Sequence, residues 1–87
     1  MKGKKIQQQI LSYYAVFDPA VEGGFNVSFP DFPGCYTFGT TFEEAKQKAE
    51  EVLELWLEHL ASKEEAIPLH TRRPIIDEIQ VHAPVFA

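Results

Sequence analysis

The pattern of apolar and polar positions changes character along the chain. Residues 9–17 (QILSYYAVF) carry apolar side chains on both alternating faces, whereas residues 25–29 (FNVSF) alternate strictly, and a third short run covers residues 35–39. Period-two alternation predicts β-strands. Apolar residues on both faces of the first run predict a strand covered on both sides, or one whose second side is closed by a partner subunit.

Two short turn clusters separate these runs. Asp18-Pro19 opens the first cluster, which ends at Gly23-Gly24, and residues 30–34 (PDFPG) form the second. Pro33-Gly34 suits the central positions of a type II turn, because glycine accepts the positive φ needed there. Connections this short predict an antiparallel meander of three strands.

At Thr41 the period becomes that of a helix. Residues 41–44 (TFEE) form a capping box, in which the Thr41 hydroxyl accepts from the Glu44 N–H and the Glu44 carboxylate reaches back. The helix fades near Ser62-Lys63. Its apolar stripe consists of Phe42, Ala45, Ala49, Val52, Leu53, Trp56 and Leu60. Leu55 and Leu57 broaden this stripe, which fits contact with a second subunit or, equally, cover from the C-terminal segment.

Residues 75–82 (IIDEIQVH) alternate weakly and predict a fourth strand. The expected fold class is therefore α+β in the order β-β-β-α-β, a mainly antiparallel sheet with one amphipathic helix packed on a face. The 87 residues suit one domain with a modest core, and residues 1–8 are expected to form a flexible N-terminal tail. Oligomerisation would add stability to a domain of this size.

Charge and composition restrict the class of function. A formal net charge of −5 argues against a protein that wraps phosphate backbones, but it suits a basic partner, including one that itself binds nucleic acid. The sequence lacks both a run of about 18 apolar residues and the apolar core of a signal peptide. Cys35 is the single cysteine. These features predict a cytoplasmic protein.

The sequence offers no constellation typical of catalysis or of a metal site. Asp18, Glu22 and Asp31 lie in turns, where such residues are common, and no Cys/His pair has the spacing of zinc ligands. Cys35 is expected to be an inert packed thiol. We therefore expect no catalytic residue, metal or cofactor. The enzymatic alternative is a metal-dependent nuclease that uses Asp18 and Asp31.

Two features indicate possible binding surfaces. Glu50, Glu54 and Glu58 share the helix face opposite the apolar stripe, which is either a solvated face or a docking face for a basic partner. Phe32 and Tyr36 lie in and after the second turn cluster, beside a possible sheet edge. An aromatic pair at an exposed edge is typical of a recognition surface. The other interpretation is that both residues pack into the local core.

Several short motifs occur in a particular order. They are Tyr13 to Phe17, Gly23-Gly24-Phe25, Val27 to Asp31, Pro33-Gly34-Cys35 with Thr37 and Gly39, Thr41 to Ala45, Leu53 to Leu57, and Ile67-Pro68. Together they resemble the N-terminal domain of HicB-like antitoxins, over roughly Tyr13 to Pro68.

The resemblance implies a β-β-β-α-β fold similar to a truncated RNase H sheet without its catalytic carboxylates. It also implies homodimers or higher oligomers, and neutralisation of a HicA-type toxin, a small basic protein that cleaves mRNA, by covering its active site. The expected partner-binding residues are Phe32, Tyr36, Glu50, Glu54 and Glu58, and the expected dimer contacts are Leu55 and Leu57.

Many relatives carry a C-terminal DNA-binding domain. This chain ends at Ala87 and is expected to lack one, so direct DNA binding is not expected, nor is a membrane partner. The alternative to an antitoxin is a toxin-free oligomeric module that binds another protein or a small ligand.

Overall fold

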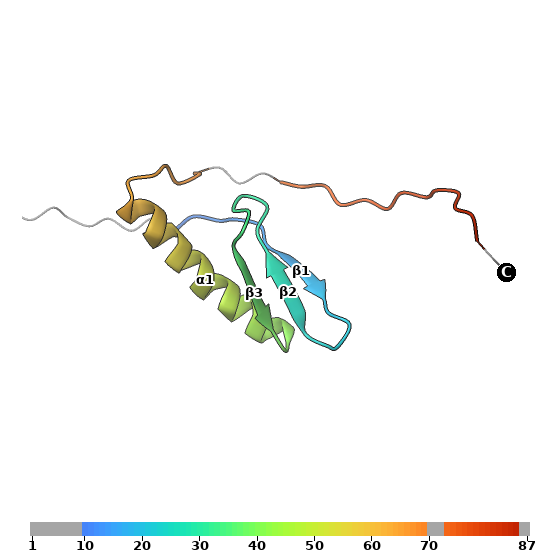
Figure 1. Cartoon of the computed structure of the whole chain (residues 1–87). Helices are drawn as coiled ribbons and strands as arrows, with labels where there is room; N and C mark the ends of the chain where they lie inside the picture. Colours follow the sequence, from blue (N-terminus) through green and yellow to red (C-terminus); the bar gives the residue numbers. More distant parts are fainter. Residues whose placement is uncertain (1–9, 70–72, 86–87) are drawn as a thin grey trace, which may run out of the picture.

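The computed structural model describes residues 10–69 and 73–85, so the predicted tail at residues 1–8 lies outside the described residues. Three strands, β1 (Val16–Pro19), β2 (Phe25–Ser28) and β3 (Tyr36–Gly39), are followed by one helix, α1 (Phe42–Ser62). The strand order is β1-β2-β3, and both pairs are antiparallel (Figure 1). The predicted α+β meander with its helix is thereby confirmed.

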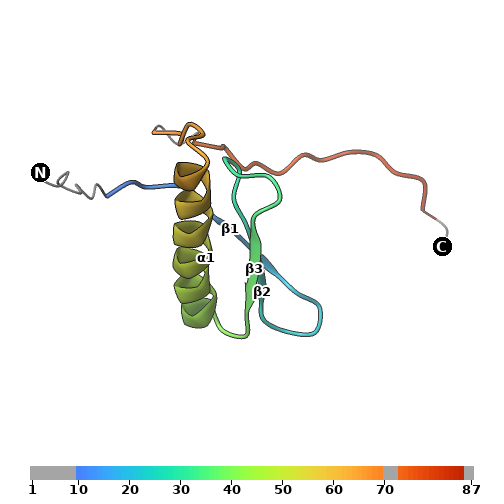
Figure 2. The ribbon, with the colours of Figure 1, turned by 60° about the vertical axis from the view of Figure 1, so that its left-hand side comes forward.

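Helix and sheet form two layers, as Figure 2 shows. Directly paired residues of antiparallel strands point to the same face, so the register defines rows that run across the sheet. The rows facing α1 are Phe17–Val27–Thr37 and Pro19–Phe25–Gly39. The rows on the other face are Val16–Ser28–Tyr36 and Asp18–Asn26–Phe38. The fold therefore has one covered sheet face and one open sheet face.

The core lies between α1 and the covered sheet face and extends into the loop before β3. Its buried residues are Val27, Phe29, Phe32, Cys35, Ala45 and Ala49. The two alanines allow the helix to approach the sheet closely. At Gly39 the approach is so close that an added Cβ would lie 2.3 Å from the backbone nitrogen of Ala45. Only glycine fits there without a shift of the helix.

The turn predicted at Pro33-Gly34 is confirmed. The Cys35 N–H donates to the Phe32 carbonyl at 3.1 Å, and Gly34 has a φ of 93°. The preceding Phe29 carbonyl accepts from the Phe32 N–H at 3.0 Å. These two consecutive turns bring Phe32 back beneath the sheet, where it joins the core.

Thr41 is the N-cap residue of α1, as predicted, and its hydroxyl accepts from the Glu44 N–H at 3.1 Å. The Glu44 carboxylate reaches one residue further back than the sequence indicated. Its Oε1 accepts from the Thr40 N–H at 2.6 Å and from the Thr40 hydroxyl at 2.7 Å. These bonds, the backbone one first, lower the pKa of Glu44 because they favour its charged form.

The C-terminal end of α1 forms a Schellman motif. The Glu65 N–H donates to the Leu60 carbonyl at 2.9 Å, and the Glu64 N–H donates to the Ala61 carbonyl at 3.0 Å. Glu64 has a φ of 57°, the left-handed conformation that glycine usually supplies at this position. The helix therefore ends close to the predicted boundary at Ser62-Lys63.

The segment after the helix is held against the N-terminal segment. The Tyr13 hydroxyl donates to the Pro68 carbonyl, and the Tyr13 ring meets the Phe32 ring edge-on at 4.9 Å. Burial, together with the nearby charge of Asp31, raises the pKa of Tyr13. The hydroxyl consequently stays protonated and keeps this hydrogen bond at neutral pH.

The extent of the first strand and the presence of a fourth strand were predicted wrongly. β1 begins at Val16 instead of near residue 9, because β2 ends at Ser28 and the chain turns away at Pro30, leaving residues 10–15 without a strand to pair with. Residues 75–82 are extended, but they join no sheet among the described residues. The predicted fourth strand is therefore not formed within this single chain.

Candidate partner-binding surfaces

The open sheet face is the most apolar exposed surface of the folded body. On β3, Tyr36 is 68% exposed and Phe38 is 41% exposed, and Tyr14, before β1, is 45% exposed. Asp18, Asn26 and Ser28 add polar groups, and residues of β1, β2 and β3 line a shallow hollow of 320 Å³. Apolar and aromatic side chains beside a few polar groups are typical of a protein interface.

A second surface is the acidic stripe of α1, formed by Glu50, Glu54 and Glu58. All three side chains are exposed, and their spacing places them on the helix face opposite Ala45 and Ala49. The stripe therefore faces away from the sheet. It and the open sheet face lie on opposite sides of the molecule.

The structure separates the two aromatic residues that the sequence placed on one recognition surface. Phe32 is only 4% exposed and packs in the core, whereas Tyr36 lies on the open sheet face. The two consecutive turns before β3 account for this difference, since they direct Phe32 inward. Phe32 and Tyr36 therefore do not form a shared exposed pair, and Phe32 supports the core instead.

Leu55 and Leu57 are separated as well. Leu55 is 65% exposed, whereas Leu57 is half-buried and packs against the core. Two residues of helix correspond to a rotation of about 200°, so the two side chains lie on opposite flanks of the acidic stripe. They do not form one patch that could serve as a single dimer contact.

Within the described ranges 10–69 and 73–85, no group of three or more His, Cys, Asp or Glu side chains could hold a metal ion. Asp18 lies near the beginning of β2 and Asp31 beyond its end, so the pair suggested for a nuclease is not brought together. Cys35 is 1% exposed, and burial raises the pKa of its thiol. A raised pKa is the opposite of what activates a cysteine nucleophile.

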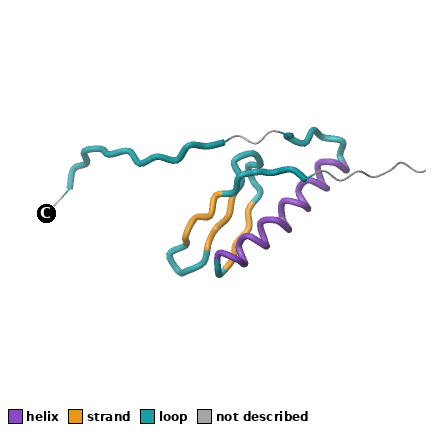
Figure 3. Tube along the Cα trace, turned by 180° about the vertical axis from the view of Figure 1, so that it is seen from behind, coloured by secondary structure: helices purple, strands orange, loops and turns teal. Residues whose placement is uncertain are grey.

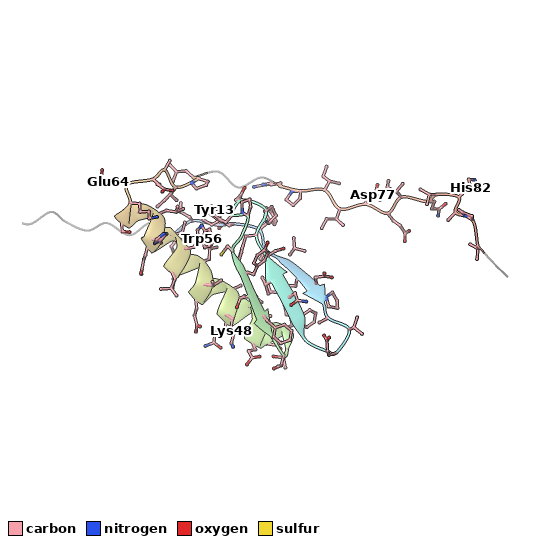
Figure 4. The ribbon with its side chains drawn as sticks, viewed as in Figure 1. Tyr13, Lys48, Trp56, Glu64, Asp77 and His82 are labelled. Carbon is pink, nitrogen blue, oxygen red and sulfur yellow. The ribbon has the colours of Figure 1, made fainter. Side chains whose placement is uncertain are left out.

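The lower half of the covered face has an aromatic cluster that the sequence did not identify as a unit. The Phe42 ring lies 4.9 Å from that of Phe17 and 5.9 Å from that of Phe25, and Lys46 Nζ is 5.8 Å from the Phe42 ring centre. Figure 4 shows Tyr13 and Trp56 at the other end of the helix-and-sheet body. Aromatic packing thus anchors both ends of α1.

Sequence reasoning also missed Tyr14 and Phe38 as parts of the open sheet face. The signal was available in the alternation, because Phe38 is two residues from Tyr36 and must share its face. What concealed it was the assumption that the second face would be covered.

The family described as "HicB_like antitoxin of bacterial toxin-antitoxin system" matches residues 13–85. The chain belongs to the HicB-like antitoxin family. The match extends beyond α1 through most of the exposed C-terminal segment, so this segment is a part of the family domain.

Named relatives agree with this assignment. The chain is 41% identical to Antitoxin HicB 1 of Photorhabdus laumondii over 59 residues, which are 68% of this chain but 38% of that protein. It is 33% identical to UPF0150 protein Ta0767 of Thermoplasma acidophilum over 73 residues, 84% of this chain and 100% of the relative. UPF0150 protein ssr1765 of Synechocystis is 34% identical over 70% of this chain and 77% of its own length.

Family membership supports an antitoxin role in a toxin–antitoxin system and implies a toxin as partner. It also suggests a regulatory role rather than an enzymatic one. Among the residues that the structure describes, no helix is long and apolar enough to cross a membrane.

Proposed function

We propose that this chain neutralises a HicA-type mRNA-cleaving toxin by binding over its active site, in the cytoplasm where such a toxin acts. The observation that carries the proposal is the acidic stripe on the exposed face of α1 in a member of an antitoxin family. A protein that binds and cleaves RNA presents basic surface, which an acidic stripe complements.

The stripe lacks compensating charge on its own helix. Neither Glu54 nor Glu58 has a lysine or arginine three or four residues away. Carboxylates spaced at i and i+4 repel each other and cost a few tenths of a kcal/mol per pair (~0.2–0.5 kcal/mol). A basic partner docked on this face would remove that repulsion, so the stripe favours the bound state over the free state.

The shape of α1 also suits occlusion. A helix of 21 residues is about 30 Å long, which is enough to span the catalytic surface of a small protein. Leu55, 65% exposed beside the stripe, would give the interface an apolar contact within a polar surround. We accordingly propose Glu50, Glu54, Glu58 and Leu55 as the toxin contact.

The test is titration calorimetry of the full chain against the HicA-type protein encoded beside it, together with an RNA-cleavage assay. Glu54→Lys/Glu58→Lys should weaken binding, reduce its dependence on salt and restore RNA cleavage. The matched control is Glu22→Lys/Glu64→Lys, which makes the same change in net charge away from the stripe and should bind nearly as the unmodified protein does.

Equal weakening in both double variants would reduce the stripe to a contribution of net charge alone. If the unmodified chain fails to bind the toxin at micromolar concentrations, the toxin proposal is refuted. The chain would then be better described as a toxin-free oligomeric module.

We further propose that the chain self-associates through its open sheet face. Tyr36 and Phe38 provide the apolar contact there, and the acidic stripe lies on the opposite side of the molecule. A homo-oligomer built through the open face therefore leaves the stripe available to a toxin. Single-domain antitoxins of this kind would bind toxin and self at once and would not need to contact DNA directly.

A further inference from the structure

The C-terminal segment, residues 73–85, has apolar side chains that nothing in the chain covers. It runs away from the sheet as an extended strand-like segment (Figures 1 and 3), and Asp77 and His82 lie far from the folded body in Figure 4. Ile75, Ile76, Ile79, Val81 and Val85 are each at least 77% exposed. An exposed apolar set of this kind marks an interaction segment.

β1 is an unprotected sheet edge. α1 packs chiefly on β3 and less on β2, so the helix shields the β3 side of the sheet and leaves the β1 side bare. Residues 10–15 continue the extended chain before β1, beyond the end of β2. An edge strand presents unpaired N–H and C=O groups, which readily accept another strand.

The surface area indicates how much cover is missing. The chain exposes 7991 Å², whereas a compact monomer of its mass of 9.9 kDa is expected to expose about 5200 Å². The excess greatly exceeds the roughly 800 Å² that each partner buries in a stable complex of standard size. A second copy of the chain could therefore be accommodated as a structural requirement of the fold.

We propose that residues 75–81 of one copy add as a strand along β1 of a second copy, with the reciprocal exchange closing a two-fold dimer. This inference rests on the self-association proposed above. Ile75, Ile79 and Val81 alternate with Glu78 and Gln80, so an added strand places its apolar residues on one face and its polar residues on the other. Both exposed elements, the edge and the segment, are then satisfied by a single symmetric contact.

Exchange between copies accounts for more of the exposed surface than a strand folded back within one chain. A strand added in the same chain would occupy the β1 edge but would leave Tyr36 and Phe38, two strands away on β3, uncovered. Exchange brings the body of a second copy alongside the sheet, where it can cover the open face too.

The deciding experiment uses the unmodified full chain. Its mass is measured by sedimentation equilibrium, and isotope-filtered nuclear Overhauser effects are recorded on an equal mixture of ¹³C-labelled and unlabelled protein. We expect a dimer with effects between the methyl groups of Ile79 and Val81 in one copy and protons of Val16 and Phe17 in the other. A dimer without these contacts overturns strand exchange but leaves self-association standing, whereas a monomer overturns both.

A pair of matched variants gives an independent readout. Ile79→Lys/Val81→Lys places two charges on the apolar side of the segment and should raise the dimer dissociation constant roughly 100-fold. Gln80→Lys/His82→Lys adds the same number of lysines on the polar side and should leave it within a few-fold. Equal effects in both variants, with helix content unchanged by circular dichroism, would overturn the proposed strand orientation.

Discussion

At the scale of single residues, contacts between small groups determine how close α1 lies to the sheet. Gly39 meets the backbone of Ala45 with no room for a side chain, and Ala45 itself is completely buried. Because the neighbouring atoms belong to the backbone at the start of a capped helix, they cannot rotate away. The side-chain volume at these two positions therefore sets the spacing between the layers.

Gly39→Ala should lower the free energy of unfolding by about 2–3 kcal/mol, because the added methyl group overlaps the Ala45 backbone. Urea denaturation followed by circular dichroism measures this change. Gly23→Ala is the control: a Cβ there meets nothing within 4 Å, and only its φ of 103° is strained, at a cost of about 1 kcal/mol. A smaller loss for Gly39→Ala than for Gly23→Ala would contradict the close packing.

Glu44 should make stability depend on pH. Its pKa is lowered from the ordinary value of 4.5, first by the bond from the Thr40 backbone N–H. The carboxylate therefore stabilises the fold above pH 4.5, and this contribution is lost as the pH falls through the folded-state pKa.

Urea denaturation between pH 7 and pH 3 measures this contribution. Glu44→Gln keeps the acceptor oxygen but does not ionise there, so it should flatten the fall in stability on the acidic side. Glu22→Gln, in the loop before β2, removes a carboxylate without a capping role and should alter the slope less. If the two variants give the same pH profile, the Thr40 bonds do not stabilise the charged form.

At the scale of elements, each boundary follows from where hydrogen bonds can be completed. β1 is short because β2 turns away after Ser28, and proline at position 30 has no N–H to offer a ladder. α1 begins at Thr41 because the hydroxyl satisfies a free backbone N–H. It ends in a Schellman motif that holds Glu64 in the left-handed conformation.

Glu64→Gly should raise the free energy of unfolding by roughly 0.5–1 kcal/mol, since glycine adopts a φ of 57° without the strain of a Cβ. Thermal and urea denaturation would both report the gain. Glu65→Gly removes a neighbouring carboxylate at a residue without positive φ and should not stabilise. A gain of equal size in both variants would attribute the effect to charge instead of backbone conformation.

At the scale of the whole molecule, the single chain is an incomplete structure. Its radius of gyration is 17.9 Å, against about 12 Å expected for a compact chain of this length. One sheet face, one sheet edge and the C-terminal segment all expose apolar groups. The physical consequence is that stability should depend on how much partner is available.

The melting temperature should therefore rise with protein concentration, because association stabilises only the folded state. We expect a clear increase between 1 and 100 μM in differential scanning calorimetry (a range of about 100-fold, worth about 2.7 kcal/mol of binding free energy). Tyr36→Ser/Phe38→Ser should reduce this increase without lowering helix content at the highest concentration. A melting temperature independent of concentration would mean that the monomer is stable on its own.

The sequence by itself determined the elements and the caps. Period-two alternation, Pro33-Gly34 and the Thr41 capping box are local signals, and each depends on residues within a few positions of one another. For the same reason the helix boundaries and the type II turn could be predicted from sequence. The acidic stripe was equally accessible, because helical spacing alone places Glu50, Glu54 and Glu58 on one face.

Tertiary structure alone decided which predicted surface residues meet. The two consecutive turns direct Phe32 into the core while Tyr36 stays on the open face, and helical geometry combined with sheet packing separates Leu55 from Leu57. The Glu44 carboxylate bonds Thr40 instead of Thr41 because the N-terminal turn of α1 begins after an extended connection. Likewise, strand formation at residues 75–82 requires a free sheet edge at the right place, and a sequence pattern specifies an edge-seeking strand without specifying which chain supplies the edge.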